Sequence, residues 1–219
     1  MSLASTAERA WWLRALLVLQ SPRPVFAALR DDSREAAEAR QEPITALVLL
    51  AGVAAFLMEP VTGRLLDESD ADAVLVAVVA FLAGAFSGLV GYWIGGAAVL
   101  AGARGAGAAA SYRGARHAVA FAAAPIALSL LVLWPVRLSL YGLDLFRTGG
   151  SDGGGAGRAF DLAEWVFGVW ALALLVVALR ILYRLAWVRV AGALAVSVAA
   201  LFGLLIVMAV FFQGIGGGA

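Results

Sequence analysis

The chain has 219 residues, of which 63% are hydrophobic and 14% charged, and its formal net charge is +1. Soluble domains are about half apolar and about 25% charged. Because long uncharged runs separate the charges here, composition excludes an ordinary soluble domain and indicates an integral membrane protein. The sequence contains no cysteine, which excludes disulfides and thiolate chemistry, and its single histidine, His117, excludes a multi-histidine metal site.

Residues 1–42 are predicted to form a cytoplasmic segment that does not cross the membrane. Its apolar stretch, residues 10–19, is interrupted by Arg14 and is too short to span a bilayer. A secretory signal is the competing interpretation, but a small-residue cleavage site is lacking. Four apolar residues recur at helical spacing with Arg14 on the opposite face, namely Trp12, Ala15, Leu16 and Leu19. We therefore expect an N-terminal amphipathic helix that lies in the membrane interface.

Residues 43–213 are predicted to form one all-α membrane domain, a bundle of five transmembrane spans. The spans are expected at about residues 43–60, 73–101, 116–140, 160–185 and 190–212, and residues 214–219 form a tail. The acidic run at residues 67–72 lacks the glycine and the terminal glutamate of a calcium-binding loop, so we expect a solvated loop there.

Glycines follow one face of the second span. Gly84, Gly88, Gly91 and Gly95 are separated by steps of four, three and four residues. Small residues at this spacing let helices approach closely in lipid, which predicts a helix-packing face. A substrate groove or a dimer face remains an alternative for the same glycines. In the third span, Pro125 and Pro135 predict a kink or local unwinding.

The distribution of arginine predicts the orientation of the bundle. All 16 basic residues are arginines, and six of them lie in the N-terminal segment. The loops after the second and fourth spans contain three each, which leaves four on the other side. Basic residues concentrate on the cytoplasmic side of membrane proteins. We therefore expect a multi-pass protein of the cell (inner) membrane with its N-terminus in the cytoplasm and its C-terminus outside.

Three ionisable residues are expected near the outer boundary of the membrane, namely Glu59, Arg137 and Glu164. A charge in the membrane is costly unless it is paired. We expect Arg137 to form an ion pair with Glu59 or Glu164 that ties spans together. A proton- or ion-handling site is the alternative, although such a site is expected deeper in the bilayer.

The inner ends of the spans carry a basic fringe, which consists of Arg104, Arg113, Arg116, Arg180, Arg184 and Arg189. Arginines at such ends set topology and extend their side chains toward the interface. The functional interpretation is that they contact anionic lipid head groups. His117, at the start of the third span, fits an interfacial helix start better than a proton relay.

Catalysis finds no support in the residue pattern. The serines at positions 87, 111, 129 and 139 lack a glycine elbow, and no nucleophile, base and orienting group can be identified together. The glycine-rich stretch at residues 149–157 lacks a phosphate-binding motif and reads as a linker. We expect no enzymatic activity, no cofactor, no metal and no nucleic-acid partner.

Three stretches, in their order and spacing, resemble the Yip1 domain family of polytopic membrane proteins. The first is LVLQSPRPVFAALRDD before the first span, and the second is GARGAGAAASYRGARHAVAFAAAP at the approach to the third. The last is ALRILYRLAWVRVAGALAV, the arginine-bearing turn before the fifth span. The resemblance extends from about Leu17 to Phe212.

The resemblance implies five spans, a cytoplasmic N-terminus and membership of a group without established enzymatic chemistry. Eukaryotic relatives act in vesicle trafficking and contact small GTPases and one another, whereas prokaryotic relatives mostly lack an assigned role. The long cytoplasmic N-terminal region of the eukaryotic members is nearly absent here, which argues against a GTPase partner.

We therefore expect a prokaryotic Yip1-like protein that organises membrane proteins or lipids, with membrane lipids as partners and itself or another membrane protein as further partners. Its N-terminal helix would help to shape the bilayer. The alternative is a small lipid or solute transporter, or an accessory permease subunit, which would use the proline-broken third span.

Overall fold

The computed structural model describes residues 3–67 and 72–216, with side chains described from residue 10 to residue 211. Two members of the acidic run, Glu68 and Asp70, lie outside the described residues. The α-helices are α1 (Leu3–Leu17), α2 (Pro22–Ala28), α3 (Arg34–Ala39), α4 (Gln41–Leu57), α5 (Ala73–Gly105), α6 (Tyr112–Ala122), α7 (Ala124–Tyr141), α8 (Gly155–Leu182) and α9 (Trp187–Gly216). The loops contain the 3-10 turns η1 (Thr62–Arg64), η2 (Gly142–Phe146) and η3 (Ser151–Gly153).

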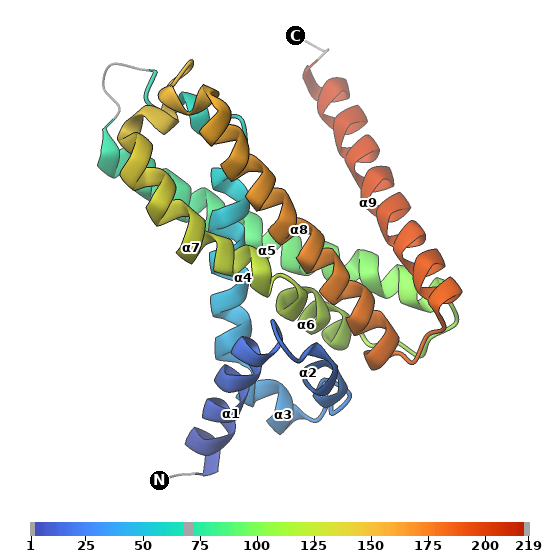
Figure 1. Ribbon diagram of the computed structural model, residues 1–219. Helices are drawn as coiled ribbons and strands as arrows, with labels where there is room; N and C mark the ends of the chain where they lie inside the picture. Colours follow the sequence, from blue (N-terminus) through green and yellow to red (C-terminus); the bar gives the residue numbers. More distant parts are fainter. Residues whose placement is uncertain (1–2, 68–71, 217–219) are drawn as a thin grey trace.

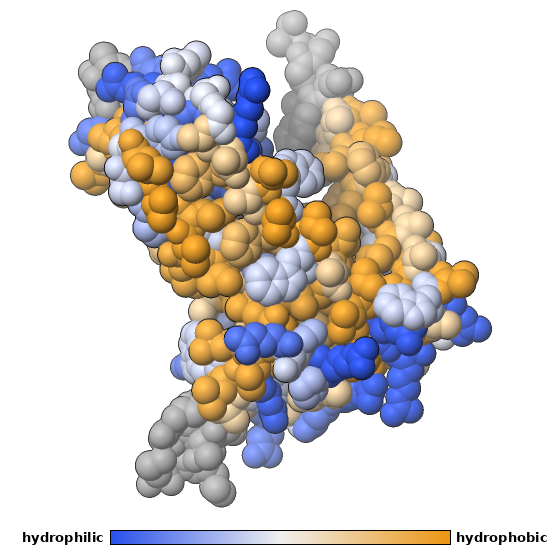
Figure 2. Space-filling model, viewed as in Figure 1, coloured by the Kyte–Doolittle hydropathy of each residue, from blue (hydrophilic) through white to orange (hydrophobic). Residues whose placement is uncertain are grey.

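Four helical stretches among the described residues are long and apolar enough to cross a membrane, namely Ala73–Gly105, Tyr112–Phe146, Gly155–Leu182 and Trp187–Phe211. The helix α4 is also apolar, but its 17 residues extend only about 25 Å, less than the ~30 Å of a bilayer core. Figure 2 shows a broad apolar surface between two polar ends. The prediction of an all-helical protein with several membrane spans is thereby confirmed, with four candidate spans where the sequence predicted five.

The third predicted span consists of two helices, α6 and α7, that are separated at Ala123. Pro125 lies in the first turn of α7, where its missing N–H would have no helical partner in any case. Pro135 lies inside α7. The span begins at Tyr112, earlier than the predicted residue 116. The reason is that Ser111 caps α6: its hydroxyl accepts a hydrogen bond of 3.0 Å from the Gly114 amide.

Helices α4 and α5 approach closely through glycines on both sides. A Cβ atom added at Gly52 would overlap the carbonyl oxygen of Gly84 and would lie 2.5 Å from the Cα atom of Gly88. One added at Gly88 would overlap the carbonyl oxygen of Val48. The partner of Gly84 and Gly88 is therefore α4, which the glycine spacing could not identify.

The four glycines of the predicted packing face do not share one role. Gly84 and Gly88 contact α4, whereas a Cβ atom at Gly95 would make only an ordinary contact of 3.6 Å with Val119 of α6. A Cβ atom at Gly91 would meet nothing within 4 Å. Gly91 instead lines an apolar space beside α5, so it lacks the close contact that Gly84 and Gly88 make.

The N-terminal segment packs against the arginine-rich end of the bundle, which we call the inner end after the orientation that the sequence predicts; the opposite end is called the outer end. Val25, Phe26 and Leu29, in and just after α2, are buried, and they belong to one hydrophobic cluster with Phe121 of α6 and Leu174 of α8. Arg30 fixes the same contact by donating a hydrogen bond of 3.1 Å from Nε to the carbonyl oxygen of Ile181. Burial of these side chains, at about 1.5–3 kcal/mol each, anchors residues that the sequence suggested would lie outside the bundle.

Helix α1 presents a different buried face from the predicted stripe. Trp11, Ala15 and Val18 are buried. Of the stripe, Ala15 alone is buried, and Trp12 and Leu16 are exposed. Other exposed apolar residues lie beside them, so α1 offers apolar surface on a second side, at Trp12, Leu13, Leu16 and Leu17.

Helix α9 contacts the bundle near its beginning and then stands apart from α8 (Figure 1). A Cβ atom added at Gly102 of α5 would overlap the Ala193 carbonyl oxygen and the Ser197 hydroxyl, which marks the contact between α5 and α9. From residue 198 to residue 211 the side chains of α9 are exposed. A helix that is apolar on all sides suits a lipid environment.

Candidate functional site

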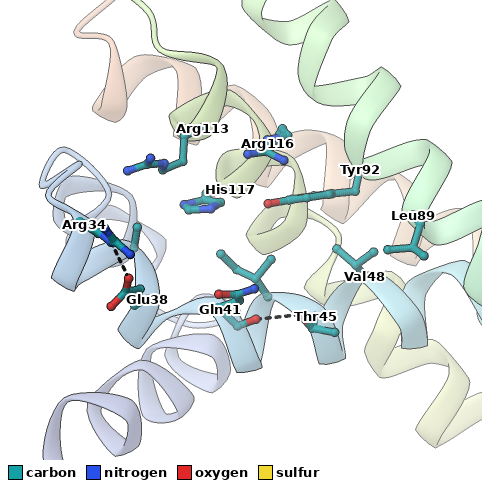
Figure 3. A pocket seen from close by; sticks show the side chains of 12 residues that line it. Arg34, Glu38, Gln41, Thr45, Val48, Leu89, Tyr92, Arg113, Arg116 and His117 are labelled. Carbon is teal, nitrogen blue, oxygen red and sulfur yellow. Dashed lines mark hydrogen bonds and ion pairs between the residues drawn. The ribbon is translucent and has the colours of Figure 1, made fainter. Parts of the chain in front are cut away.

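A pocket of about 530 Å³ lies between α3, α4, α5 and α6, near the inner ends of the helices (Figure 3). We call it the inner basic pocket. Its polar and charged lining residues are Arg34, Glu38, Gln41, Thr45, Tyr92, Arg113, Arg116 and His117. Three arginines thus face one carboxylate, and the pocket is electropositive. Figure 3 shows His117 and Tyr92 projecting from different helices toward the space above Gln41.

Helix α3 supplies Arg34 and Glu38 because Ser33 begins that helix: its hydroxyl accepts a hydrogen bond from the Ala36 amide at 3.3 Å. The two side chains form an ion pair on one helix face, with Arg34 Nε 2.9 Å from Glu38 Oε1. Both remain largely exposed, so the pair contributes little to stability and the Arg34 guanidinium keeps donors for a ligand.

Asp32 joins the N-terminal segment to α6. Its carboxylate lies 3.6 Å from Arg40 Nη2 and 3.6 Å from Arg113 Nη1, and it accepts a hydrogen bond of 3.0 Å from the Ser111 hydroxyl. One carboxylate therefore holds two arginines in place. Since a single negative charge serves two positive ones, Arg113 is not fully neutralised.

Arg40, just before α4, is fully buried, at 0% exposure. It donates a hydrogen bond of 2.9 Å to the Asp31 carbonyl oxygen, and its guanidinium carbon lies 5.4 Å from the centre of the Trp11 ring. Burial lowers the pKa of Arg40 from its ordinary value, and the Asp32 and Asp31 carboxylates oppose that shift. The residue connects α1, the Asp32 loop and the start of α4.

Arg116 occupies an aromatic cage. Its guanidinium carbon lies 3.8 Å from the ring centre of Trp93, 4.8 Å from that of Tyr112 and 5.2 Å from that of Tyr92. Gly96 makes room for it, because a Cβ atom there would overlap Arg116 Cγ. The Nε atom is buried without a hydrogen-bond partner among the described residues. Cation–π contacts hold the charge without neutralising it.

His117 is buried in α6, at 7% exposure, although the sequence suggested an interfacial position. Its Nδ1 atom has no hydrogen-bond partner in the part of the chain that the structure describes. Arg113, Arg116 and His117 lie within two helical turns, and α6 directs all three toward the pocket.

The other arginines of the predicted basic fringe do not line this pocket. Arg104 donates to the carbonyl oxygen of Ala110 at 3.2 Å and closes the loop between α5 and α6. Arg180 stacks on Trp187, at 4.2 Å from the ring centre. Arg184, with φ of 53°, ends α8 in the left-handed region, and Arg189 is exposed on α9.

The structure therefore brings together two of the six predicted arginines, Arg113 and Arg116, and adds Arg34, which sequence reasoning missed. The apolar residues of α2 fold the N-terminal segment back onto the bundle, and this fold places α3 beside α6. Ser33 is a capping residue that could have indicated a helix at this position, but no local signal specifies where such a helix would dock.

At the outer end, Arg137 contacts three carboxylates. We call Arg137 and these three carboxylates the outer cluster. Its Nη2 atom lies 2.9 Å from Asp152 and 3.2 Å from Asp161, and its Nη1 atom lies 3.5 Å from Glu164. Glu59 lines the same cavity of about 170 Å³ but forms no ion pair with Arg137 among the described contacts. The sequence predicted Glu59 or Glu164 as the partner of Arg137. The structure pairs Arg137 with Glu164 and, in place of Glu59, with Asp152 of η3 and Asp161 near the start of α8.

Among the described residues, no group of three or more histidine, aspartate or glutamate side chains is arranged to hold a metal ion. The inner basic pocket offers donors instead, from guanidinium, amide and hydroxyl groups. Guanidinium groups match the geometry of phosphate oxygens and bind them through paired hydrogen bonds. The arrangement is suited to hold an oxyanion.

The comparisons with known proteins give one match. No curated protein and no solved structure matches the chain. The Yip1 domain matches residues 16–210, which include α2 to α8, the inner basic pocket and the outer cluster. The chain therefore belongs to the Yip1 domain family.

Proposed function

We propose that the protein is a non-enzymatic membrane component that organises lipids by binding anionic head groups in the inner basic pocket. The observation that carries this proposal is the charge of the pocket, where Arg34, Arg113 and Arg116 line the walls and Glu38 is the only carboxylate among the lining residues. Asp32, outside the lining, is shared between Arg113 and Arg40. A phosphate group would accept hydrogen bonds from Arg34 and Arg113, which both retain exposed surface. Arg116, inside its aromatic cage, would add a fixed positive charge.

The proposed orientation places this pocket at the cytoplasmic face of a cell (inner) membrane. Most arginines lie at this end, as the positive-inside rule requires for the cytoplasmic side. Anionic lipids give the cytoplasmic leaflet a negative surface potential, which attracts basic residues near the membrane. The exposed side of α1, with Trp12, Leu13 and Leu16, would lie in the interface beside the pocket.

We further propose that α4 crosses the membrane as a fifth span. In Figure 1, α1 and the C-terminal end of α9 lie at opposite ends of the bundle, which agrees with an odd number of crossings. Helix α4 leads from the N-terminal segment to η1, which lies beside η2 at the outer end, where the Leu66 amide donates to the Phe146 carbonyl oxygen at 2.8 Å. A span shorter than the bilayer core is accommodated by local thinning of the bilayer.

The outer cluster is proposed to have a structural role. Arg137 lies on α7, and its partners lie on η3 and α8, so the ion pairs tie these elements together at the membrane boundary. Glu164 is 4% exposed and faces the guanidinium, which offsets the cost of burying both charges.

A lipid-organising role has more support than transport. A transporter would need polar groups along a path near the membrane centre. The space beside α5 at that depth is lined mainly by valine, alanine and glycine, with Ser87 and Tyr92 as the polar residues of its lining. Further partners would be a second copy or another membrane protein, for which the exposed half of α9 offers apolar surface.

The test is native mass spectrometry of the full chain after exposure to phosphatidylglycerol and to phosphatidylcholine. The variant Arg34→Gln/Arg113→Gln removes two charges from the pocket. A matched control, Arg184→Gln/Arg189→Gln, removes two exposed charges elsewhere at the inner end. We expect the pocket variant to lose phosphatidylglycerol affinity by about tenfold or more, as each charge-assisted hydrogen bond contributes about 1.5–3 kcal/mol.

The control variant is expected to keep wild-type selectivity for the anionic lipid. Equal losses in both variants would mean that the arginines act only through net charge. No preference of the wild type for phosphatidylglycerol over phosphatidylcholine would reject the head-group site.

A further inference from the structure

The inner basic pocket continues into an apolar groove of about 200 Å³. Two residues, Val48 of α4 and Tyr92 of α5, line both spaces. The residues that the groove adds include Ala51, Ala55, Gly88, Gly91, Val119 and Ala123. Pocket and groove are therefore two consecutive parts of one recess.

The direction of this recess follows from the helix register. On α4, the pocket is lined from Gln41 to Val48 and the groove from Val48 to Ala55. On α6, the pocket residues begin at Arg113, and the groove residues end at Ala123, just beyond the helix. Both helices thus show the same order, with charge at the inner end and small apolar side chains toward the membrane centre.

Glycine explains why the groove is open. Gly91 carries no side chain, and a Cβ atom there would meet nothing within 4 Å. One turn away, Gly88 and Gly52 hold α4 close to α5, so the groove has a floor of backbone atoms. Ala55 of α4 and Ala123, just after α6, also line the groove, and their small side chains leave it open.

We propose that this groove holds one acyl chain of an anionic glycerophospholipid whose phosphate occupies the inner basic pocket, an inference that rests on the proposed head-group site. The sequence of charge and then apolar surface, from the membrane face inward, matches the order of groups in a phospholipid. A free phosphate or a soluble phosphate ester would use the pocket but not the groove.

The experiment measures how binding depends on acyl chain length, using native mass spectrometry of the full chain. The probes are glycerophosphoglycerol, dihexanoyl phosphatidylglycerol and dioctanoyl phosphatidylglycerol, with inorganic phosphate as a competitor. Gly91→Leu and Ala55→Leu fill the groove from two different helices. Gly168→Leu is the matched control, since a Cβ atom at Gly168 of α8 also meets nothing within 4 Å and this residue does not line the groove.

We expect the wild type and Gly168→Leu to bind the dioctanoyl lipid about tenfold more tightly than the dihexanoyl lipid, since each buried methylene favours binding. In Gly91→Leu and Ala55→Leu this ratio is expected to fall below about threefold, while glycerophosphoglycerol binds as in the wild type. An unchanged thermal unfolding midpoint in at least one of the two groove variants establishes that its fold is intact.

Equal chain-length ratios in the groove variants and in Gly168→Leu would overturn the inference and leave the head-group site in place. Competition by inorganic phosphate as effective as that by the dioctanoyl lipid would also overturn it, because the ligand would then be a soluble phosphate. Failure of the head-group site is a separate result: phosphatidylcholine and phosphatidylglycerol would bind the wild type equally, with or without Arg34 and Arg113.

Discussion

Arg40 is a buried cation that holds the N-terminal segment to the membrane bundle. It is fully buried, pairs with Asp32 at 3.6 Å and donates to the Asp31 carbonyl oxygen at 2.9 Å. A buried charge is stable only while its partners remain. Arg116 is held differently, by three aromatic rings that leave its charge without a carboxylate partner among the described ion pairs.

Replacing Arg40 is therefore expected to loosen the N-terminal segment. Arg40→Gln removes the ion pair, the charge-assisted hydrogen bond and the contact with Trp11, and should lower the free energy of unfolding by roughly 2–4 kcal/mol. The measurement is thermal unfolding in detergent, followed by tryptophan fluorescence. Arg34→Gln breaks only an exposed ion pair and should cost about 0.5 kcal/mol or less. Equal destabilisation by the two variants would contradict the anchoring role.

Helical rise for Arg137 and the start of the fourth span for Glu164 predict that both lie at one level of the bundle. In the structure their side chains lie 3.5 Å apart. Arg34 and Arg40 could not be placed in this way. Their surroundings depend on how α2 folds back beneath α8, and no helical register specifies that arrangement.

At the scale of helices, the most extensive contact in the bundle is between α4 and α5. It depends on Gly52, a residue that the sequence reasoning did not single out, and on Gly84 and Gly88, which it did. Periodicity identified the face of α5, but it did not identify the partner helix. A row of glycines shows on which face of a helix another helix can pack closely. Which helix packs there depends on the rest of the fold.

Gly52→Ala is expected to push α4 away from α5. The added Cβ atom would overlap the Gly84 carbonyl oxygen, and backbone atoms cannot move aside as a flexible side chain can. Overpacking of this kind typically costs about 1–3 kcal/mol. Thermal unfolding in detergent would measure the loss, with Gly168→Ala as the control because its Cβ atom enters open space. A Gly52→Ala protein as stable as this control would contradict the close packing.

For the whole molecule, the number of membrane crossings depends on α4. The apolar helices themselves could be predicted from the sequence, because run length against bilayer thickness indicates a span directly. Helix α4 is the exception, since it ends at Leu57 and Pro60 follows in the outer turn. Its path from the N-terminal segment to η1 supports the proposed crossing.

The absence of cysteine from the sequence allows a direct test of the five-span arrangement. Single substitutions Ser21→Cys, Val61→Cys, Ala109→Cys and Ser151→Cys place one thiol in each of four connecting segments. All four positions are exposed, so folding should be unaffected. In intact cells, a membrane-impermeant maleimide is expected to label positions 61 and 151, and to label positions 21 and 109 only after the membrane is permeabilised.

Labelling of positions 21 and 61 from the same side would mean that α4 does not cross, and the bundle would then have four spans. The head-group site requires more than the crossing number, because Arg34 precedes α4 and Arg113 follows α5. These two arginines can face the same leaflet only if α4 and α5 cross the membrane in opposite directions. Protection of positions 21 and 109 together would therefore place both halves of the inner basic pocket at the cytoplasmic surface.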